Sequence, residues 1–257
     1  MKTTRVLTGG AALLMAASAL AGCGTKATSA DPMGQYEAKK GEIPSMVKNF
    51  SGPNLGVLLS GAEIGGLSPK VIDAETVGTM RLADQQGTEL IQAATFDPAN
   101  CQQKLLETYK DNSELPAAFS QGVSAGNATT IRVQLRSHPA VEEAGEPSQT
   151  QQALAETCPS YTVTVPGTDG KAGEVTQFKM SAEAFPLEGA TDGLMTTLTA
   201  SPSGGSSFTE VGIFQRVGNL DLRVYFDGKE PEKDAAAAKA DLQNLVTHLG
   251  QALVAKG

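Results

Sequence analysis

The chain has 257 residues, a formal net charge of −8 and no tryptophan. This excess of acid is a poor match for nucleic acid, which selects clusters of Lys and Arg, so we expect no nucleic-acid partner. Aromatic residues make up 5% of the chain, which argues against a surface that stacks sugars or bases. The length suits one well-buried core.

Residues 1–22 have the pattern of a secretion signal. Lys2 and Arg5 precede an apolar run that ends in small residues. The run is shorter than the roughly 20 apolar residues of a spanning helix. It leads into Leu-Ala-Gly-Cys at 20–23, which resembles the lipobox of bacterial lipoproteins. The resemblance implies that Cys23 is modified through its sulfur by a diacylglyceryl group, with palmitate as an acyl chain, and becomes the mature N-terminus; a plain secretory signal is the alternative.

The segment 23–50 is predicted to be a lipidated N-terminus and a flexible tether. It is rich in Gly, Ser, Thr, Ala and Lys and has no apolar periodicity. We therefore expect the protein on the extracytoplasmic face of the cell membrane, with the membrane as a partner through the lipid on Cys23. A docked arm is the alternative for part of the tether, because four of its residues could cover apolar surface: Ile43, Met46, Val47 and Phe50.

The first two helix starts are read from capping residues. Ser60 with Glu63 makes a capping box, which predicts a short helix or turn that ends at Gly65-Gly66. Asp97 as N-cap with Pro98 in the first turn predicts a second helix. One face of that helix would then be directed at the core by residues spaced four apart: Cys101, Leu105 and Tyr109.

A third helix is predicted to begin with Ser148 and Gln151 as the capping pair and to end at Pro159. Leu154 and Cys158 lie one turn apart within it. The alternation of apolar and polar residues over 161–165 then predicts a half-buried strand.

Further strands are predicted at 88–96, 129–136, 174–183 and 193–200. Gly218-Asn219 has the residues of a tight two-residue turn, so the strands on either side of it form the clearest hairpin. Its second strand alternates Leu, Leu, Val and Phe with Asp, Arg and Tyr, which predicts one buried face and one wet face. The stretch from Pro231 to Lys256 is predicted to be an amphipathic C-terminal helix. The fold class is therefore α+β, a single domain over residues 51–257.

With Cys23 assigned to lipid, Cys101 and Cys158 remain as a pair. In an extracytoplasmic chain such a pair is most simply a disulfide. A redox-active or metal-binding pair is the alternative, but the close C-x-x-C spacing and a nearby histidine are lacking.

The order of these signals resembles a known family. The residues are the Leu58 to Leu67 opening, the Asp97 to Cys101 helix start, Cys158 to Val163 and Arg216 to Val224, followed by the helix after Pro231. Together they are similar to the extracellular sensor domain of the mycobacterial serine/threonine kinase PknH and to related actinobacterial lipoproteins. The resemblance implies a twisted antiparallel sheet with helices packed on it and a cleft for an unidentified ligand. The chain departs from it by having one cysteine pair instead of two bridges, and no kinase domain.

The histidines do not indicate an enzyme. His138 and His248 are interpreted as solvated surface imidazoles, and the chain lacks the nucleophile-elbow, zincin and P-loop motifs. We expect no catalytic residue and no cofactor.

Two weaker patterns are also assigned no chemistry. Ser45 to Lys48 fits S-x-x-K, a match expected by chance and set in the tether. Glu142, Glu143 and Glu146 are interpreted as a solvated connecting loop; a divalent-ion site is the alternative, but their spacing fits no known metal loop, so we expect no metal.

Three functional hypotheses follow. The preferred one is a non-enzymatic binding lipoprotein, a sensor or carrier whose cleft holds a small or apolar envelope molecule. The second is an interaction module that docks an envelope protein on its acidic surface or an uncovered strand edge. The third is a hydrolase. The residues that line a cleft cannot be told from the sequence, because apolar strand positions look alike whether they face a core or a cavity.

Overall fold

The computed structural model describes residues 46–109, 115–124, 128–167 and 173–255. The expected signal segment, Cys23 and the expected tether up to residue 45 lie outside these ranges. Within them, no helix combines the length and the apolar character that crossing a bilayer requires.

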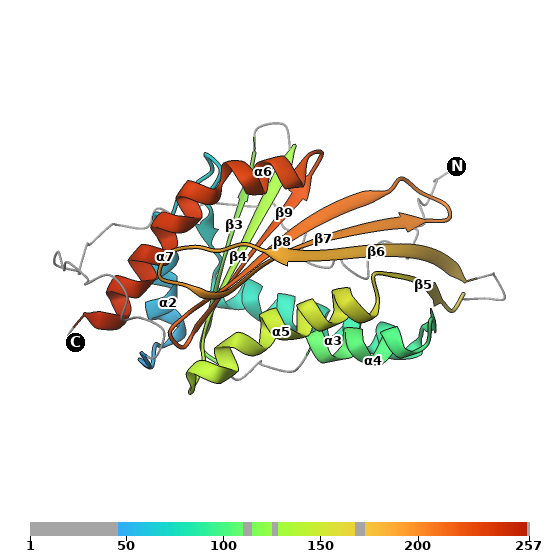
Figure 1. Ribbon diagram of the computed structural model, residues 1–257, viewed down its shortest axis with the longest axis horizontal. Coiled ribbons are helices and arrows are strands. Elements are labelled where there is room, and N and C mark those ends of the chain that lie inside the picture. Colours follow the sequence, from blue (N-terminus) through green and yellow to red (C-terminus); the bar gives the residue numbers. More distant parts are fainter. Residues whose placement is uncertain (1–45, 110–114, 125–127, 168–172, 256–257) are drawn as a thin grey trace.

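A nine-stranded antiparallel sheet runs through the molecule, in the order β1-β3-β4-β9-β8-β7-β6-β5-β2. It is strongly twisted, so that β3, β4 and β9 lie at a large angle to β5 and β6 in Figure 1. The strands are β1 (Lys70–Val71), β2 (Thr95–Asp97), β3 (Ala117–Val123), β4 (Thr129–Ser137), β5 (Ser160–Val165), β6 (Glu174–Ala184), β7 (Thr191–Pro202), β8 (Phe208–Val217) and β9 (Leu220–Gly228). The α+β fold class expected from the sequence is confirmed.

Helices cover both faces of the sheet (Figure 1). Three of them pack on the side of β4, β8 and β9 that carries the main apolar core: α2 (Gly52–Leu59), α6 (Pro231–Ala237) and α7 (Lys239–Val254). The other three pack on the opposite face, with a second apolar cluster beneath them: α3 (Ala74–Ala93), α4 (Asn100–Thr108) and α5 (Val141–Thr157).

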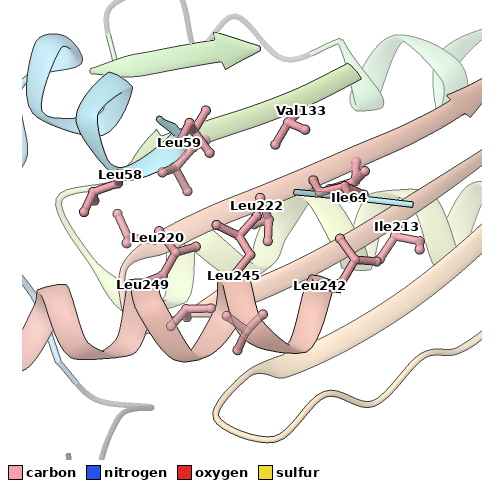
Figure 2. Close-up of a cluster of buried hydrophobic side chains, with 14 of the residues drawn as sticks. Leu58, Leu59, Ile64, Val133, Ile213, Leu220, Leu222, Leu242, Leu245 and Leu249 are labelled. Carbon is pink, nitrogen blue, oxygen red and sulfur yellow. The ribbon is translucent and has the colours of Figure 1, made fainter. Parts of the chain in front are cut away.

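The main core lies between α7, α2 and the hairpin of β8 and β9, as Figure 2 shows. Leu220 and Leu222 of β9 face the buried stripe of α7, while Leu58 and Leu59 close the core from α2. Burying each such side chain contributes about 1.5–3 kcal/mol. The predicted C-terminal helix is confirmed, with a break at Ala238, and its predicted stripe is buried: Leu242, Leu245, Val246, Leu249 and Leu253.

Of the short helix or turn predicted to start at Ser60, the helix is wrong, because α2 ends there and turns follow. In α2 the N-cap is Ser51, whose hydroxyl accepts the Asn54 N–H, and Ser60 is the C-cap. The chain then turns through Gly65 and Gly66, both with positive φ, as expected for the glycines of a tight turn.

The strand predicted at 88–96 is also wrong over most of its length. Helix α3 extends to Ala93, and only Thr95–Asp97 forms a strand. Helix α3 is capped by Asp73, which accepts the Thr76 N–H at 2.9 Å. Asp97 is not an N-cap, since α4 begins three residues later.

Helix α5 begins earlier than its predicted start at Ser148. It starts at Val141 and contains Pro147 in its interior. Because proline usually breaks a helix, the sequence favoured a start after it. Glu142 and Glu143 occupy the first turn, where carboxylates are favoured by the helix dipole. The acidic run is therefore part of a helix and not a connecting loop.

Residues 46–50 form an extended, docked segment, so this end of the expected tether differs from prediction and matches the docked-arm alternative. Phe50 is buried and Met46 packs against the main core, whereas Val47 is exposed. Lys48 donates from Nζ to the carbonyls of Ala252 and Ala255 at the end of α7, at 3.0 and 3.1 Å. A cation there satisfies carbonyls that a helix leaves unpaired.

The buried side chain of Asn219 holds this segment in place. Its Oδ1 accepts the Lys48 N–H at 3.0 Å, and its Nδ2 donates to the carbonyls of Lys48 and His138. The predicted hairpin turn is confirmed, but only Gly218 has positive φ. Asn219 therefore serves through its side chain, not through an unusual backbone conformation.

Candidate functional site

The second face of the β8–β9 hairpin is buried, so the wet face expected from the sequence is wrong. Asp221 and Arg223 of β9 are 2% and 9% exposed. Alternate residues of β4, β8 and β9 share this face through their cross-strand register. Together with Asp192, which pairs with it, we call this set the charged face: Arg132, Arg136, His138, Asp192, Glu210, Arg216, Asp221, Arg223, Tyr225 and Asp227.

Ion pairs compensate the buried charges of this face. Arg223 donates from Nε and Nη2 to Oδ2 of Asp221, at 2.8 and 2.7 Å. Arg132 pairs with Glu210 and also lies 5.4 Å from the ring centroid of Tyr225. Buried charges are tolerated when they are paired and hydrogen-bonded in this way.

The pKa shifts on this face follow from burial and from the arginines. Burial is the largest single influence and by itself would raise the pKa of Asp221, but the charge of Arg223 and the other cationic and hydrogen-bonding groups around the carboxylate together outweigh it, so the pKa of Asp221 lies below its usual range. For Glu210 burial outweighs the charge of Arg132 and the pKa is raised. Burial likewise raises the pKa of the Tyr225 hydroxyl. The lowered pKa keeps Asp221 ionised at neutral pH.

The two histidines have different environments. His138 is 4% exposed, so the interpretation as a surface imidazole is wrong for it. Its Nε2 lies 3.8 Å from Oδ2 of Asp221 and has no hydrogen-bond partner among the described residues. His248 is exposed on α7, outside the apolar stripe, as predicted.

A bulge in β7 carries an ion pair that lies directly under α5. The register between β7 and β8 changes between Thr191 and Leu194. Asp192 has a φ of 56°, which is uncommon for a residue other than glycine. Oδ2 of Asp192 accepts from Nε of Arg216 at 2.5 Å. A Cβ at Gly145 of α5 would come within 2.9 Å of that carboxylate. The missing side chain therefore lets α5 approach the ion pair.

Beside this bulge a groove separates α5 from β6 and β7. Its volume is about 320 Å³, and it is open to solvent on one side. The small side chains of Ala182 and Ala184 lie along its strand wall, while Gln149 and Gln152 of α5 offer amide groups. The full lining is Ser148, Gln149, Gln152, Ala155, Glu156, Ala182, Glu183, Ala184, Asp192, Gly193 and Leu194. We call it the α5–β6 groove.

The lining of the α5–β6 groove combines polar and apolar side chains. Its lining offers amides, a hydroxyl and carboxylates, together with an apolar patch of alanines and Leu194. None of these lining residues is a histidine, cysteine, lysine or arginine. Across the described ranges of the chain, no group of three or more His, Cys, Asp or Glu side chains is arranged to hold a metal ion.

The structure joins Cys101 and Cys158 in a buried disulfide, with their Cα atoms 5.8 Å apart. The bridge ties the first turn of α4 to the C-cap of α5, and both helices pack on the same face of the sheet. It fixes the C-terminal end of the helix that forms one wall of the groove. No sequence pattern pointed to the groove itself, because its walls come from α5, β6 and β7 and meet only in the folded chain.

The fold defines a single α+β domain with helices on both faces of an antiparallel sheet. No family model matches the chain, and no curated protein matches it. Among solved structures, the extracellular domain of PknH from Mycobacterium tuberculosis has a TM-score of 0.41 at 13% identity, over 60% of this chain and 77% of that one.

A second solved structure is that of a putative uncharacterized protein, the Rv0999 ortholog, from Mycobacterium smegmatis. It has a TM-score of 0.39 at 14% identity, over 72% of this chain and 86% of that one. The first of these matches is to the domain that the sequence motifs resemble.

Proposed function

We propose that this protein is a non-enzymatic binding protein of the cell envelope. It is anchored to the extracytoplasmic face of the membrane by lipid on Cys23 and holds a small ligand in the α5–β6 groove. The observation that carries the proposal is the groove itself, an open space between helix and sheet whose described lining pairs hydrogen-bonding side chains with small apolar ones.

The lining favours a ligand with two kinds of surface. Ala155, Ala182 and Leu194 suit a short apolar part, while Gln149 and Gln152 suit polar groups. The Gln152 amide already donates to Glu156, but a purely apolar molecule would leave the Gln149 amide without a partner once water is displaced, at a cost of about 1–3 kcal/mol. We therefore narrow the expected small or apolar ligand to a small amphipathic one.

Two features support an exported location. The segment 1–22 has the pattern of a secretion signal, and the disulfide between Cys101 and Cys158 is of the kind that persists in oxidising compartments. Cys23→Ser should shift the protein from the membrane fraction to the soluble fraction and abolish labelling by a palmitate analogue. Cys23→Ser protein that remained labelled and membrane-bound would contradict the anchor.

The ligand proposal is tested by mass spectrometry of the protein purified under native conditions. We expect a small molecule in stoichiometric amount that is lost from Gln152→Trp, because residue 152 is exposed and lines the groove, so a large ring there fills the space without disturbing the core. Glu143→Trp, exposed on the same helix outside the lining, is the matched control and should retain the ligand. Equal retention by both variants would refute the groove as the site.

The second candidate function, docking of an envelope protein, is favoured by one specific observation. Part of β6 along the groove is an uncovered strand edge.

A further inference from the structure

The backbone of β6 has unpaired groups along the α5–β6 groove. In the ladder between β5 and β6, Ser160 faces Lys179, and the Met180 N–H donates to the carbonyl of Pro159. Pairing stops there because the residues before Pro159 belong to α5. The last four residues of β6 therefore have no strand on this side.

The register shows which backbone N–H and C=O groups of β6 have no partner strand. Residues of an antiparallel strand direct their N–H and C=O alternately to the two neighbouring strands. Since Met180 bonds toward β5 and Phe185 donates to Gly193 on the β7 side, Ala182 and Ala184 point toward the missing strand. No described residue forms a backbone hydrogen bond with them on that side.

Among the described residues, the two side chains that belong to these backbone groups are small. The side chain of Ala184 is exposed and that of Ala182 is half-buried, and both residues line the groove. By contrast, the two outermost strands of the sheet, β1 and β2, have only two and three residues, a usual protection against edge pairing. The C-terminal end of β6, a long strand, therefore has an open edge beside the groove.

The charge of the groove determines which kind of peptide can pair with the edge of β6. Asp192 is neutralised by Arg216, but Glu156 and Glu183 are exposed and no described lining residue is basic. Glu156 accepts only a neutral amide hydrogen bond from Gln152 among the contacts of the described chain. Glu156 lies on the α5 side of the sheet, whereas Glu183 faces the other side, since it pairs with Met195, which packs against the main core. An extended segment with Lys or Arg would place cations near one of these carboxylates, according to the face that its basic side chains occupy.

We propose that the α5–β6 groove binds a short, basic, extended peptide segment, which adds to the edge of β6 through the backbone groups of Ala182 and Ala184. Main-chain hydrogen bonds would supply affinity, and the carboxylates would supply preference for basic side chains. The proposal deepens the proposed function, on which it rests, because it assigns the same groove to one class of ligand.

The test uses the peptide acetyl-Lys-Val-Lys-Val-Lys-amide and the full chain in detergent. Nuclear magnetic resonance should show at least a tenfold slowing of hydrogen exchange at the amides of Ala182 and Ala184 when the peptide saturates the protein. Binding should weaken as salt is raised. The acidic peptide acetyl-Glu-Val-Glu-Val-Glu-amide should bind at least tenfold more weakly.

The variants Ala184→Pro and Ala184→Ser form a matched pair. Proline removes an N–H that faces away from β7, a position where strands tolerate it, and should lower the peptide's affinity at least tenfold. Serine keeps the N–H and should leave the affinity within a factor of two. If the proline variant does not fold, the exchange measurement on the unaltered protein decides.

Three results would overturn the inference: no slowing at the two amides, equal binding of the acidic peptide, or equal binding by the proline variant. Failure of the peptide can be told from failure of the proposed function. If the basic peptide does not bind but a co-purified molecule is lost from Gln152→Trp, the groove remains a ligand site and only the peptide assignment is wrong. If neither occurs, both are wrong.

Discussion

Replacing Asp221 by asparagine should destabilise the fold strongly. The substitution keeps the shape of the side chain but removes the charge that compensates Arg223, which donates two hydrogen bonds to it from a buried position. Breaking a buried ion pair by removing one partner costs about 3–5 kcal/mol, because the other charge remains uncompensated. We expect a loss of this size in the free energy of unfolding, measured by urea denaturation at pH 7.

The double variant Asp221→Leu/Arg223→Met separates the pair from its neighbours. It removes both charges, so most of the stability lost in Asp221→Asn should be recovered. A double-mutant cycle built from Asp221→Leu, Arg223→Met and the double variant should give a coupling free energy of more than 1 kcal/mol. A loss below about 1 kcal/mol for Asp221→Asn would refute the reasoning, since a solvated pair contributes no more than that.

The pH dependence of stability gives a second test of the contribution of Asp221. The pKa of Asp221 is lowered in the folded protein, so its contribution is complete above its unfolded pKa of about 3.9 and is lost as pH falls through the folded pKa. Asp221→Asn should lack this part of the acid-induced loss. Glu210, whose pKa is raised, acts with the opposite sign: its contribution is complete at low pH and is lost as pH rises through the folded pKa.

Three further perturbations test the parts that position the site. Replacing Cys101 and Cys158 by alanine should cost about 4 kcal/mol, because the bridge closes a loop with a sequence separation of 57; a change below 1 kcal/mol in urea unfolding would contradict this. Asn219→Ala should speed hydrogen exchange over residues 46–50 at least tenfold, because buried groups that it pairs would lose their partners, whereas the exposed Asn49→Ala should not. Lys48→Met should lower the thermal midpoint by a few degrees through lost contacts with the end of α7; an unchanged midpoint would show that the lysine contributes nothing there.

Much of the fold could be predicted where a local pattern and the tertiary packing agree. The hairpin about Gly218-Asn219 has strict alternation and a turn-forming pair, and it forms as predicted. The apolar stripe predicted for the last helix is also buried as expected, since its leucines face one core. Helix α3 was missed because threonines and glycines weaken its helical signal, and the β-branched and apolar residues near its end read as a strand.

The site could not be predicted because the burial of its charged residues and the position of α5 on the sheet both depend on segments that are distant in sequence. Asp221 and Arg223 read as a solvated face, since alternation cannot distinguish charges in water from charges paired under a helix. Pro147 and Gly145 hid the true start of α5, although Gly145 is what permits the close approach of that helix to Asp192. The groove then follows from how α5 lies on β6 and β7.

The most direct test of the groove as the ligand site is hydrogen exchange, read by mass spectrometry, on the protein purified natively and on the same protein stripped of ligand by unfolding and refolding. The ligand-bound protein should be protected in three segments that line the groove, 148–156, 182–184 and 192–194. Protection confined to α2 and α7, on the other face of the sheet, or no difference between a loaded and a stripped sample, would contradict the account.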